Sequence, residues 1–113
     1  MARRLRLARV RDAAPLFAAL GDPTRLALVA LLSSGGPASI AGLAGHVDVS
    51  RQAVTKHLHV LEDAGVVRGF RSGREHVWEI EPQRLATAQD FLARIHAQWD
   101  SALRRLEAFL EEG

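Results

Sequence analysis

Cysteine is absent from the 113 residues of this chain. Without cysteine there are no disulfide bonds, no thiolate ligands for a metal ion and no cysteine nucleophile. A chain without disulfides is compatible with a reducing compartment, and we expect the protein to be cytoplasmic. Hydrophobic residues make up 48% and charged residues 25% of the sequence, which is typical of a globular domain and not of a disordered chain.

Long apolar runs are also missing. No stretch of about 18 hydrophobic residues occurs, so we expect no membrane span. The basic start, Met1–Arg6, resembles the first part of a signal peptide, but the apolar stretch at 13–20 is short and no A-x-A-like cleavage site follows it. We therefore predict a basic N-terminal arm over residues 1–12 and a single domain over residues 13–113.

Residues arranged for catalysis are lacking too. The carboxylate pairs Glu62–Asp63 and Glu111–Glu112 are adjacent in sequence, so their side chains would diverge on a helix. The chain has no glycine-rich loop of the kind that cradles phosphate. We predict that the protein is not an enzyme and that it uses no cofactor.

Charge is unevenly distributed along the chain, although the net charge is only +2. Residues 1–74 contain eleven basic and five acidic residues, whereas residues 75–113 contain four basic and eight acidic residues. A basic front half and an acidic back half indicate a polyanionic partner on one side of the molecule.

Capping residues and turn signals divide the chain into short elements. Asp22-Pro23 predicts the start of a helix, and Ser39 and Ser50 predict two more N-caps. Gly65 is a typical residue just beyond a helix end, and a glycine-containing loop at 71–75 separates two short strands. The predicted elements are a short helix ending at Gly21, helices over 23–32, 40–47 and 51–64, strands over 66–70 and 76–80, and a long helix over about 83–111.

This order of elements, α-α-α-α-β-β-α, predicts a winged helix-turn-helix fold, mainly α with a small β-hairpin. Asp48-Val49 is the tight turn of the motif. In such folds the helix after the turn lies in the major groove of DNA, with its N-terminal residues toward the base edges.

The chemistry of that helix and of the hairpin agrees with DNA binding. With its apolar residues turned inward, the helix presents Gln52, Lys56 and His59 outward, flanked by Arg51 and Thr55. A polar outer face is also what an ordinary solvated helix has, but the arginines of the hairpin favour DNA. The predicted DNA contacts are Ser50, Arg51, Gln52, Thr55, Lys56, His59, Arg68, Arg71 and Arg74.

The last helix carries a continuous apolar stripe, which is too long for so small a domain to cover. We therefore predict a homodimer built on the first and last helices, and an operator with two-fold symmetry. The predicted interface residues are Leu16, Phe17, Leu20, Leu92, Ile95, Trp99, Leu103, Leu106 and Leu110.

Three segments resemble the ArsR/SmtB-type repressors: 20–32 to their opening helix, 49–67 to their recognition helix and 71–80 to their wing. The resemblance covers residues 14–82 closely and the last helix more loosely. It implies a homodimeric repressor that occupies a double-stranded DNA operator, with autorepression as one mode of control.

The metal-sensing residues of that family have no match in this chain. Its thiolate positions fall on Ser39 and Ala41, and its last-helix ligands fall near Pro82, Arg84, Ile95 and Gln98, none of them a usual zinc ligand. The five histidines include no i, i+4 pair, so we predict no metal site and DNA binding that does not depend on metals.

Two alternatives stay open at this point. One is a winged-helix protein-interaction module that has lost DNA binding, which should have a neutral or acidic recognition helix and wing. The other is a repressor switched by an unknown small organic effector at the dimer seam near Trp99. The sequence does not identify the operator, the regulated genes or an inducer.

Overall fold

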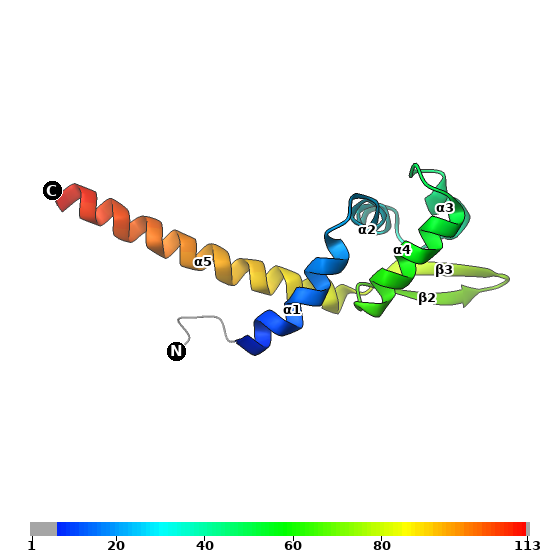
Figure 1. Ribbon diagram of the computed structural model, residues 1–113, viewed down its shortest axis with the longest axis horizontal. Coiled ribbons are helices and arrows are strands. Elements are labelled where there is room, and N and C mark those ends of the chain that lie inside the picture. The colour runs from blue at the N-terminus through cyan, green and yellow to red at the C-terminus, as the bar shows by residue number, and fades with distance from the viewer. Residues whose placement is uncertain (1–6, 113) are drawn as a thin grey trace.

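The computed structural model describes residues 7–112. A compact body of helices and a small sheet lies at one end of the molecule, and a long helix extends from it (Figure 1). The elements are α1 (Leu7–Leu20), α2 (Pro23–Gly35), β1 (Ala38–Ser39), α3 (Ile40–Ala44), α4 (Arg51–Asp63), β2 (Val67–Ser72), β3 (Glu75–Ile80) and α5 (Pro82–Glu112). The predicted winged helix-turn-helix order is confirmed.

The first helix is longer than predicted. It starts at Leu7, six residues before the predicted domain boundary, so residues 7–12 belong to α1 and not to an arm. Ion pairs to α5 hold this extra part of the helix, with Arg9 3.4 Å from Asp90 and Asp12 3.3 Å from Arg84. Such contacts between distant parts of the chain have no local signal in the sequence. Residues 1–6 of the predicted arm lie outside the described residues.

The predicted N-caps of the helices are confirmed. The Asp22 carboxylate accepts a hydrogen bond from the Arg25 backbone N–H at 3.0 Å, and Pro23 occupies the first position of α2. The Ser39 hydroxyl accepts from Gly42 N, and the Ser50 hydroxyl accepts from Ala53 N, both at 3.1 Å. Each cap satisfies a backbone donor that the first turn of a helix leaves free.

The end of α4 is equally well defined. Gly65 has a φ of +79°, a conformation that glycine adopts without strain. Its N–H donates to Glu62 O, and the next N–H, of Val66, donates to Leu61 O, both at 2.9 Å. These two bonds form a Schellman motif, which turns the chain sharply from α4 into the wing.

The sheet has three strands, one more than predicted, in the order β1-β3-β2. The additional strand is the two-residue β1, which pairs with β3 so that Ala38 is opposite Trp78 and Ser39 is opposite Val77. The hairpin itself is antiparallel from Val67 opposite Ile80 to Ser72 opposite Glu75, which leaves a tighter turn than the predicted five-residue loop. Helix α3 ends at Ala44, three residues before the predicted Val47.

The core lies between α1, α2, α4 and the sheet. Its largest fully buried side chains are Trp78, Leu16, Leu28, Leu58, Leu61, Val54, Val66 and Val67. Helix α5 contributes only Ala88 to the buried residues of this core. The body is therefore complete without most of α5, whose 31 residues make the molecule 67 Å long and only 27 by 20 Å across. Within residues 7–112, no single helix is long and apolar enough to cross a membrane. Residues 9–20 of α1 and α2 reach the required length and apolar character only together, as a pair bent by 94°.

The Asp22 cap predicts a pH-dependent stability. The backbone hydrogen bond from Arg25, together with the positive charge of Arg25 and that of His57 when protonated, lowers the pKa of the Asp22 carboxyl below its ordinary value of 3.8. A carboxyl whose pKa is lower in the folded state stabilises the fold above its unfolded pKa, and this stabilisation is lost as the pH falls through the folded-state pKa.

We expect Asp22→Asn, which keeps the capping oxygen but removes the charge, to unfold at a lower Tm than the wild type at pH 7. The difference should shrink steadily as the pH is lowered from 7 to below 3.8, and thermal unfolding followed by circular dichroism measures it. Asp48→Asn, in the exposed turn before α4, is the control and should lack this trend. An equal Tm difference at pH 7 and pH 3 would show that the charge of Asp22 has no part in it.

Candidate nucleic-acid interface

The outer face of α4 presents polar side chains from its first two turns. Arg51, Gln52 and Lys56 are exposed, and no side-chain partner lies near them among residues 7–112. Thr55 is half-buried, and its hydroxyl donates to Arg51 O at 3.0 Å, so the hydroxyl is already used within the helix. Three long side chains with free donors and the methyl group of a threonine are suited to reading the edges of base pairs.

The N-terminus of α4 is shaped for an anion. The Ser50 oxygen accepts from Ala53 N, so the cap is formed, while the hydroxyl proton of Ser50 stays free to donate. The partial positive charge at a helix N-terminus adds to this donor. The predicted phosphate contact at Ser50 is therefore compatible with its capping role.

Further along α4, His59 lies toward the wing. Its Nδ1 is 3.4 Å from a carboxylate oxygen of Glu62, and its ring meets the Trp78 ring edge-on, with 5.5 Å between centroids. The second oxygen of Glu62 accepts from Gly69 N in the wing at 3.4 Å. His59 thus belongs to the junction between α4 and the wing, and its predicted contact with DNA stays a prediction.

The wing is the hairpin of β2 and β3, and it projects from the body away from α5 (Figure 1). Arg71 is in the last part of β2 and Arg74 is in the turn; both are exposed, and neither has a partner among residues 7–112. Two free arginines near the end of a projecting hairpin can contact phosphates or enter a minor groove.

Arg68, the third arginine predicted for this surface, is not a free cation. It lies opposite Glu79 in the strand register and forms both a hydrogen bond and an ion pair with that carboxylate. Its guanidinium also lies over the Phe70 ring, 5.6 Å from the centroid. The pair has no net charge, but the Arg68 side chain is still 62% exposed, so its predicted contact with DNA stays a prediction.

The packing around Trp78 in the wing was not predicted from the sequence. The His76 ring stacks on Trp78, with 4.8 Å between centroids and 18° between planes. The stack passes directly over Gly69, where a Cβ atom would lie 2.6 Å from His76 Nε2 and 3.0 Å from the Trp78 ring. Only glycine allows this approach, so Gly69 between two strand residues was the available signal.

A polar cluster fixes the inner side of α4 to the helices beneath it. Arg25 donates through Nε to Ala19 O at 2.6 Å and lies 3.3 Å from His57 Nδ1 through its NH1. His57 Nδ1 is also 3.9 Å from the Asp22 carboxylate. His57 is therefore a packed, hydrogen-bonded side chain, and the cluster joins α4 to the ends of α1 and α2.

The residues predicted for the dimer interface fall into two groups. Leu16 is fully buried in the core of its own chain and has no surface for a partner, so that prediction is wrong. Phe17 and Leu20 are half-buried against the same core, and the Phe17 ring is 5.8 Å from that of Phe91 in α5.

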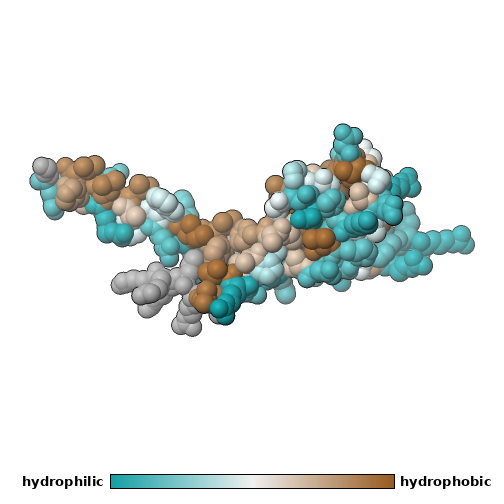
Figure 2. Space-filling view, viewed as in Figure 1, coloured by the Kyte–Doolittle hydropathy of each residue, from teal (hydrophilic) through white to brown (hydrophobic). Residues whose placement is uncertain are grey.

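The second group lies on α5 and is uncovered. Figure 2 shows hydrophobic residues along the projecting part of this helix, whereas the wing at the other end is hydrophilic. Trp99 is 65% exposed and Phe109 is 72% exposed, although Phe109 was not among the predicted residues. Ile95 is half-buried. The exposed members of the predicted stripe are Leu92, Trp99, Leu103, Leu106 and Leu110.

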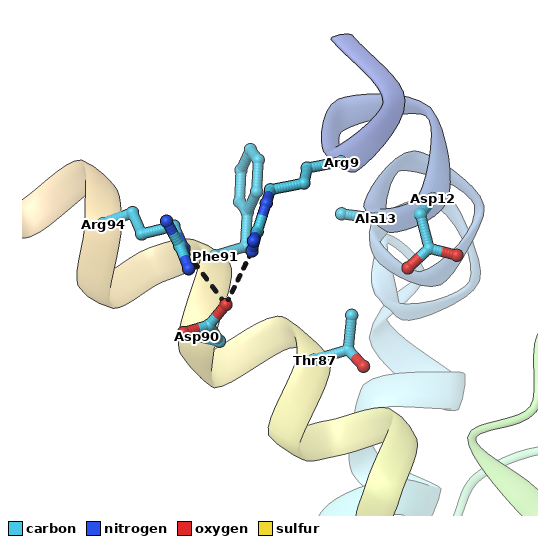
Figure 3. A pocket seen from close by; sticks show the side chains of 7 residues that line it. All are labelled: Arg9, Asp12, Ala13, Thr87, Asp90, Phe91 and Arg94. Carbon is cyan, nitrogen blue, oxygen red and sulfur yellow. Dashed lines mark hydrogen bonds and ion pairs between the residues drawn. The ribbon is translucent and has the colours of Figure 1, made fainter. Parts of the chain in front are cut away.

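A small cavity of about 60 Å³ lies between α1 and α5. Figure 3 shows Asp90 of α5 between Arg9 and Arg94, with Phe91 beside them and Asp12 across the cavity on α1. A space of this size holds about two water molecules. Within one chain it is too small for an organic effector.

Metal ligands do not gather anywhere in the described part of the chain: among residues 7–112, no three His, Asp or Glu side chains could hold an ion together. Arg84, at one position where the resemblance places a zinc ligand, instead donates to Ala64 O, to Asp12 O and to the Asp12 carboxylate. The prediction of DNA binding that does not depend on metals stays a prediction.

Comparison with known proteins gives consistent matches. A family model described as a helix-turn-helix domain matches residues 20–69. The chain is 39% identical over 85 residues to the HTH-type transcriptional regulator Rv2034 of Mycobacterium tuberculosis, an alignment that spans 75% of this chain and 76% of that protein. It is 37% identical over 78 residues to the HTH-type transcriptional repressor SmtB of the same species, spanning 68% of this chain and 57% of that repressor.

Solved structures agree with these matches. An ArsR-like transcriptional regulator from Rhodococcus sp. RHA1 superposes with a TM-score of 0.74 and 34% sequence identity, covering 88% of this chain and 93% of the other. A second structure, of the ArsR family transcriptional regulator RHA00566, has a TM-score of 0.72 at 34% identity and is covered to 98%.

Proposed function

This chain belongs to the ArsR/SmtB family of DNA-binding transcriptional repressors, and from that premise we propose that it occupies an inverted-repeat operator as a homodimer. It is a regulator and not an enzyme. Because a repressor has to reach DNA, we propose that this protein is cytoplasmic.

One observation carries the DNA-binding mode. Arg51, Gln52 and Lys56 of α4, and Arg71 and Arg74 of the wing, are exposed and have no side-chain partners among residues 7–112. A protein-interaction module would have a neutral or acidic surface here. Four unpaired cations and an amide on the helix and hairpin that a winged helix turns toward DNA favour the operator instead.

The homodimer is supported by the exposed stripe of α5. Large apolar side chains at Trp99, Leu103, Leu106 and Leu110 face solvent in the single chain, and burying each of them is favourable by about 1.5–3 kcal/mol before the cost of association. A winged helix-turn-helix DNA-binding domain from Mycobacterium bovis, 22% identical to this chain, is homodimeric. A two-fold dimer presents two copies of α4, which calls for two half-sites about one helical turn or a multiple apart.

An organic effector, if one acts on this repressor, would not fit the cavity between α1 and α5, which is only about 60 Å³, and the pocket of about 330 Å³ beside Leu32, Ile80 and Leu85 is an open hollow on the surface. The seam between two chains, where Trp99 would be buried, is the place we propose for such a molecule. Autorepression through the protein's own concentration requires no pocket and is the alternative mode of control.

The experiment for this function measures binding to the DNA upstream of the protein's own gene by fluorescence anisotropy at several salt concentrations, together with a footprint. The footprint should show two-fold symmetry. No preference over random DNA, or a footprint without symmetry, would contradict the proposed operator.

Arg74→Ala should weaken binding to all DNA sequences similarly. The exposed guanidinium in the wing turn releases counterions from a phosphate, so its loss from both chains of the dimer should reduce the slope of log K against log salt by about 1.8, or about 0.9 for each phosphate. Arg105→Ala is the matched control, since Arg105 lies on α5 and hydrogen-bonds to Ser101. An unchanged slope in Arg74→Ala would remove Arg74 from the phosphate contacts.

A further inference from the structure

Arg84 joins three helices. It lies in the first turn of α5, and its side chain is 24% exposed. Each of its three guanidinium nitrogens has an acceptor, and none of these acceptors belongs to α5 itself. Such complete use of a planar guanidinium fixes its orientation, which a flexible ammonium group would not do.

One contact reaches the end of the recognition helix. Arg84 Nε donates to the carbonyl oxygen of Ala64, the C-cap of α4, at 3.1 Å. The same side chain packs on Gly65, where an added Cβ would be 3.5 Å from Arg84 Cγ and Cδ. A cation at this end also suits the partial negative charge of the helix C-terminus.

The other two contacts reach α1. Arg84 NH2 donates to the Asp12 backbone oxygen at 2.9 Å, and NH1 lies 3.3 Å from the Asp12 carboxylate. Asp12 also borders the small cavity between α1 and α5 that Figure 3 shows. The end of α4 is therefore tied through one side chain to both α1 and α5.

We propose that Arg84 is a positioning residue that sets the angle of α4 against the α1/α5 face and thereby the spacing between the two recognition helices of the dimer. The inference rests on the proposed dimeric operator binding. A two-fold axis through α1 and α5 converts any rotation of α4 relative to them into a change in the separation of the two α4 helices, and that separation is read as half-site spacing. Arg84 itself contacts no DNA in this role.

The test compares operators that differ only in spacing. Wild-type protein selects a duplex with two half-sites from random DNA, and a second duplex carries one additional base pair between them. We expect Arg84→Met to lower the ratio of the two affinities about tenfold, mainly through tighter relative binding of the longer duplex. Asp12→Ala, which removes only the carboxylate contact, should lower it about threefold. Arg94→Met is the matched control, since Arg94 pairs with Asp90 within α5, and it should keep the wild-type ratio.

Spacing preference separates positioning from mere structural support, because a less stable protein loses affinity for both duplexes alike. Sedimentation should show all variants as dimers. A wild-type ratio in Arg84→Met overturns the inference. If Arg84→Met does not fold, Asp12→Ala decides, since the Asp12 side chain is 63% exposed and its loss should leave the fold intact. A wild-type protein that selects no paired half-sites would instead overturn the proposed dimeric function.

Discussion

Glutamate at both Trp99 and Leu106 is expected to convert the dimer into a folded monomer and to reduce operator affinity by about a hundredfold or more. The two side chains are 65% and 52% exposed in the single chain, so the body loses no contacts when they change. In the dimer they would place four carboxylates in an apolar seam, where unpaired charges are strongly disfavoured. Two linked recognition helices gain two to four orders of magnitude over one through effective concentration, and the monomer forfeits that gain.

Sedimentation equilibrium at micromolar concentration measures the change in assembly, and anisotropy on full operator and half-site duplexes measures the change in binding. Half-site affinity should stay within about twofold of the wild type, since one recognition helix and one wing are unaltered. The charge-matched control is Arg104→Gln with Arg105→Gln, which also changes the net charge by two on the polar face of α5. A wild type that is already monomeric would contradict the proposed dimer, as would a double variant that keeps the full operator affinity.

Replacement of Gln52 or Lys56 with alanine is the change expected to damage sequence recognition most. Both side chains are exposed on the first two turns of α4 and have no competing partner among residues 7–112. A bidentate pair with adenine for Gln52, or a contact to guanine for Lys56, discriminates by about 1–3 kcal/mol, which is roughly 5- to 150-fold in affinity.

The loss should appear on the operator and be much smaller on random DNA, and anisotropy with both duplexes measures it. Arg74→Ala is the comparison, because the loss of a phosphate contact should lower the affinity for the operator and the affinity for random DNA by the same factor. Equal losses on both duplexes would reassign Gln52 or Lys56 to positioning on the DNA backbone. Operators changed at single base pairs would then show which position each residue reads.

Local chemistry explains why the helix starts could be predicted. Asp22, Ser39 and Ser50 act as N-caps, and Gly65 ends α4, each through hydrogen bonds within a few residues of the cap. Strand β1 could not be predicted in the same way. Two residues after a proline have no period to detect, and Ala38 becomes a strand only because Trp78, forty residues later, pairs with it.

In the candidate site, too, local features could be predicted from the sequence and long-range contacts could not. The outward face of α4 follows from helical geometry, so Gln52 and Lys56 could be placed from the sequence. The partner of Arg68 depends on the strand register, which sets Glu79 opposite it, and the burial of Leu16 depends on which side of α1 meets the core. Neither can be read from residue type. Arg84 illustrates the point most clearly, because its acceptors lie 20 and 72 positions away in sequence.

The projecting end of α5 has a consequence for cells that contain several repressors of this fold. The DNA-binding bodies of such repressors are alike because all of them bind the same double helix. Chains of two different paralogues could therefore form unwanted heterodimers. In this chain the exposed apolar surface from Trp99 to Leu110, which would select the partner chain, is distant from the wing (Figure 1). Dimerisation specificity can therefore change while the DNA-binding surface stays the same. After a gene duplication, a few substitutions in this segment suffice to prevent heterodimers between the two regulators.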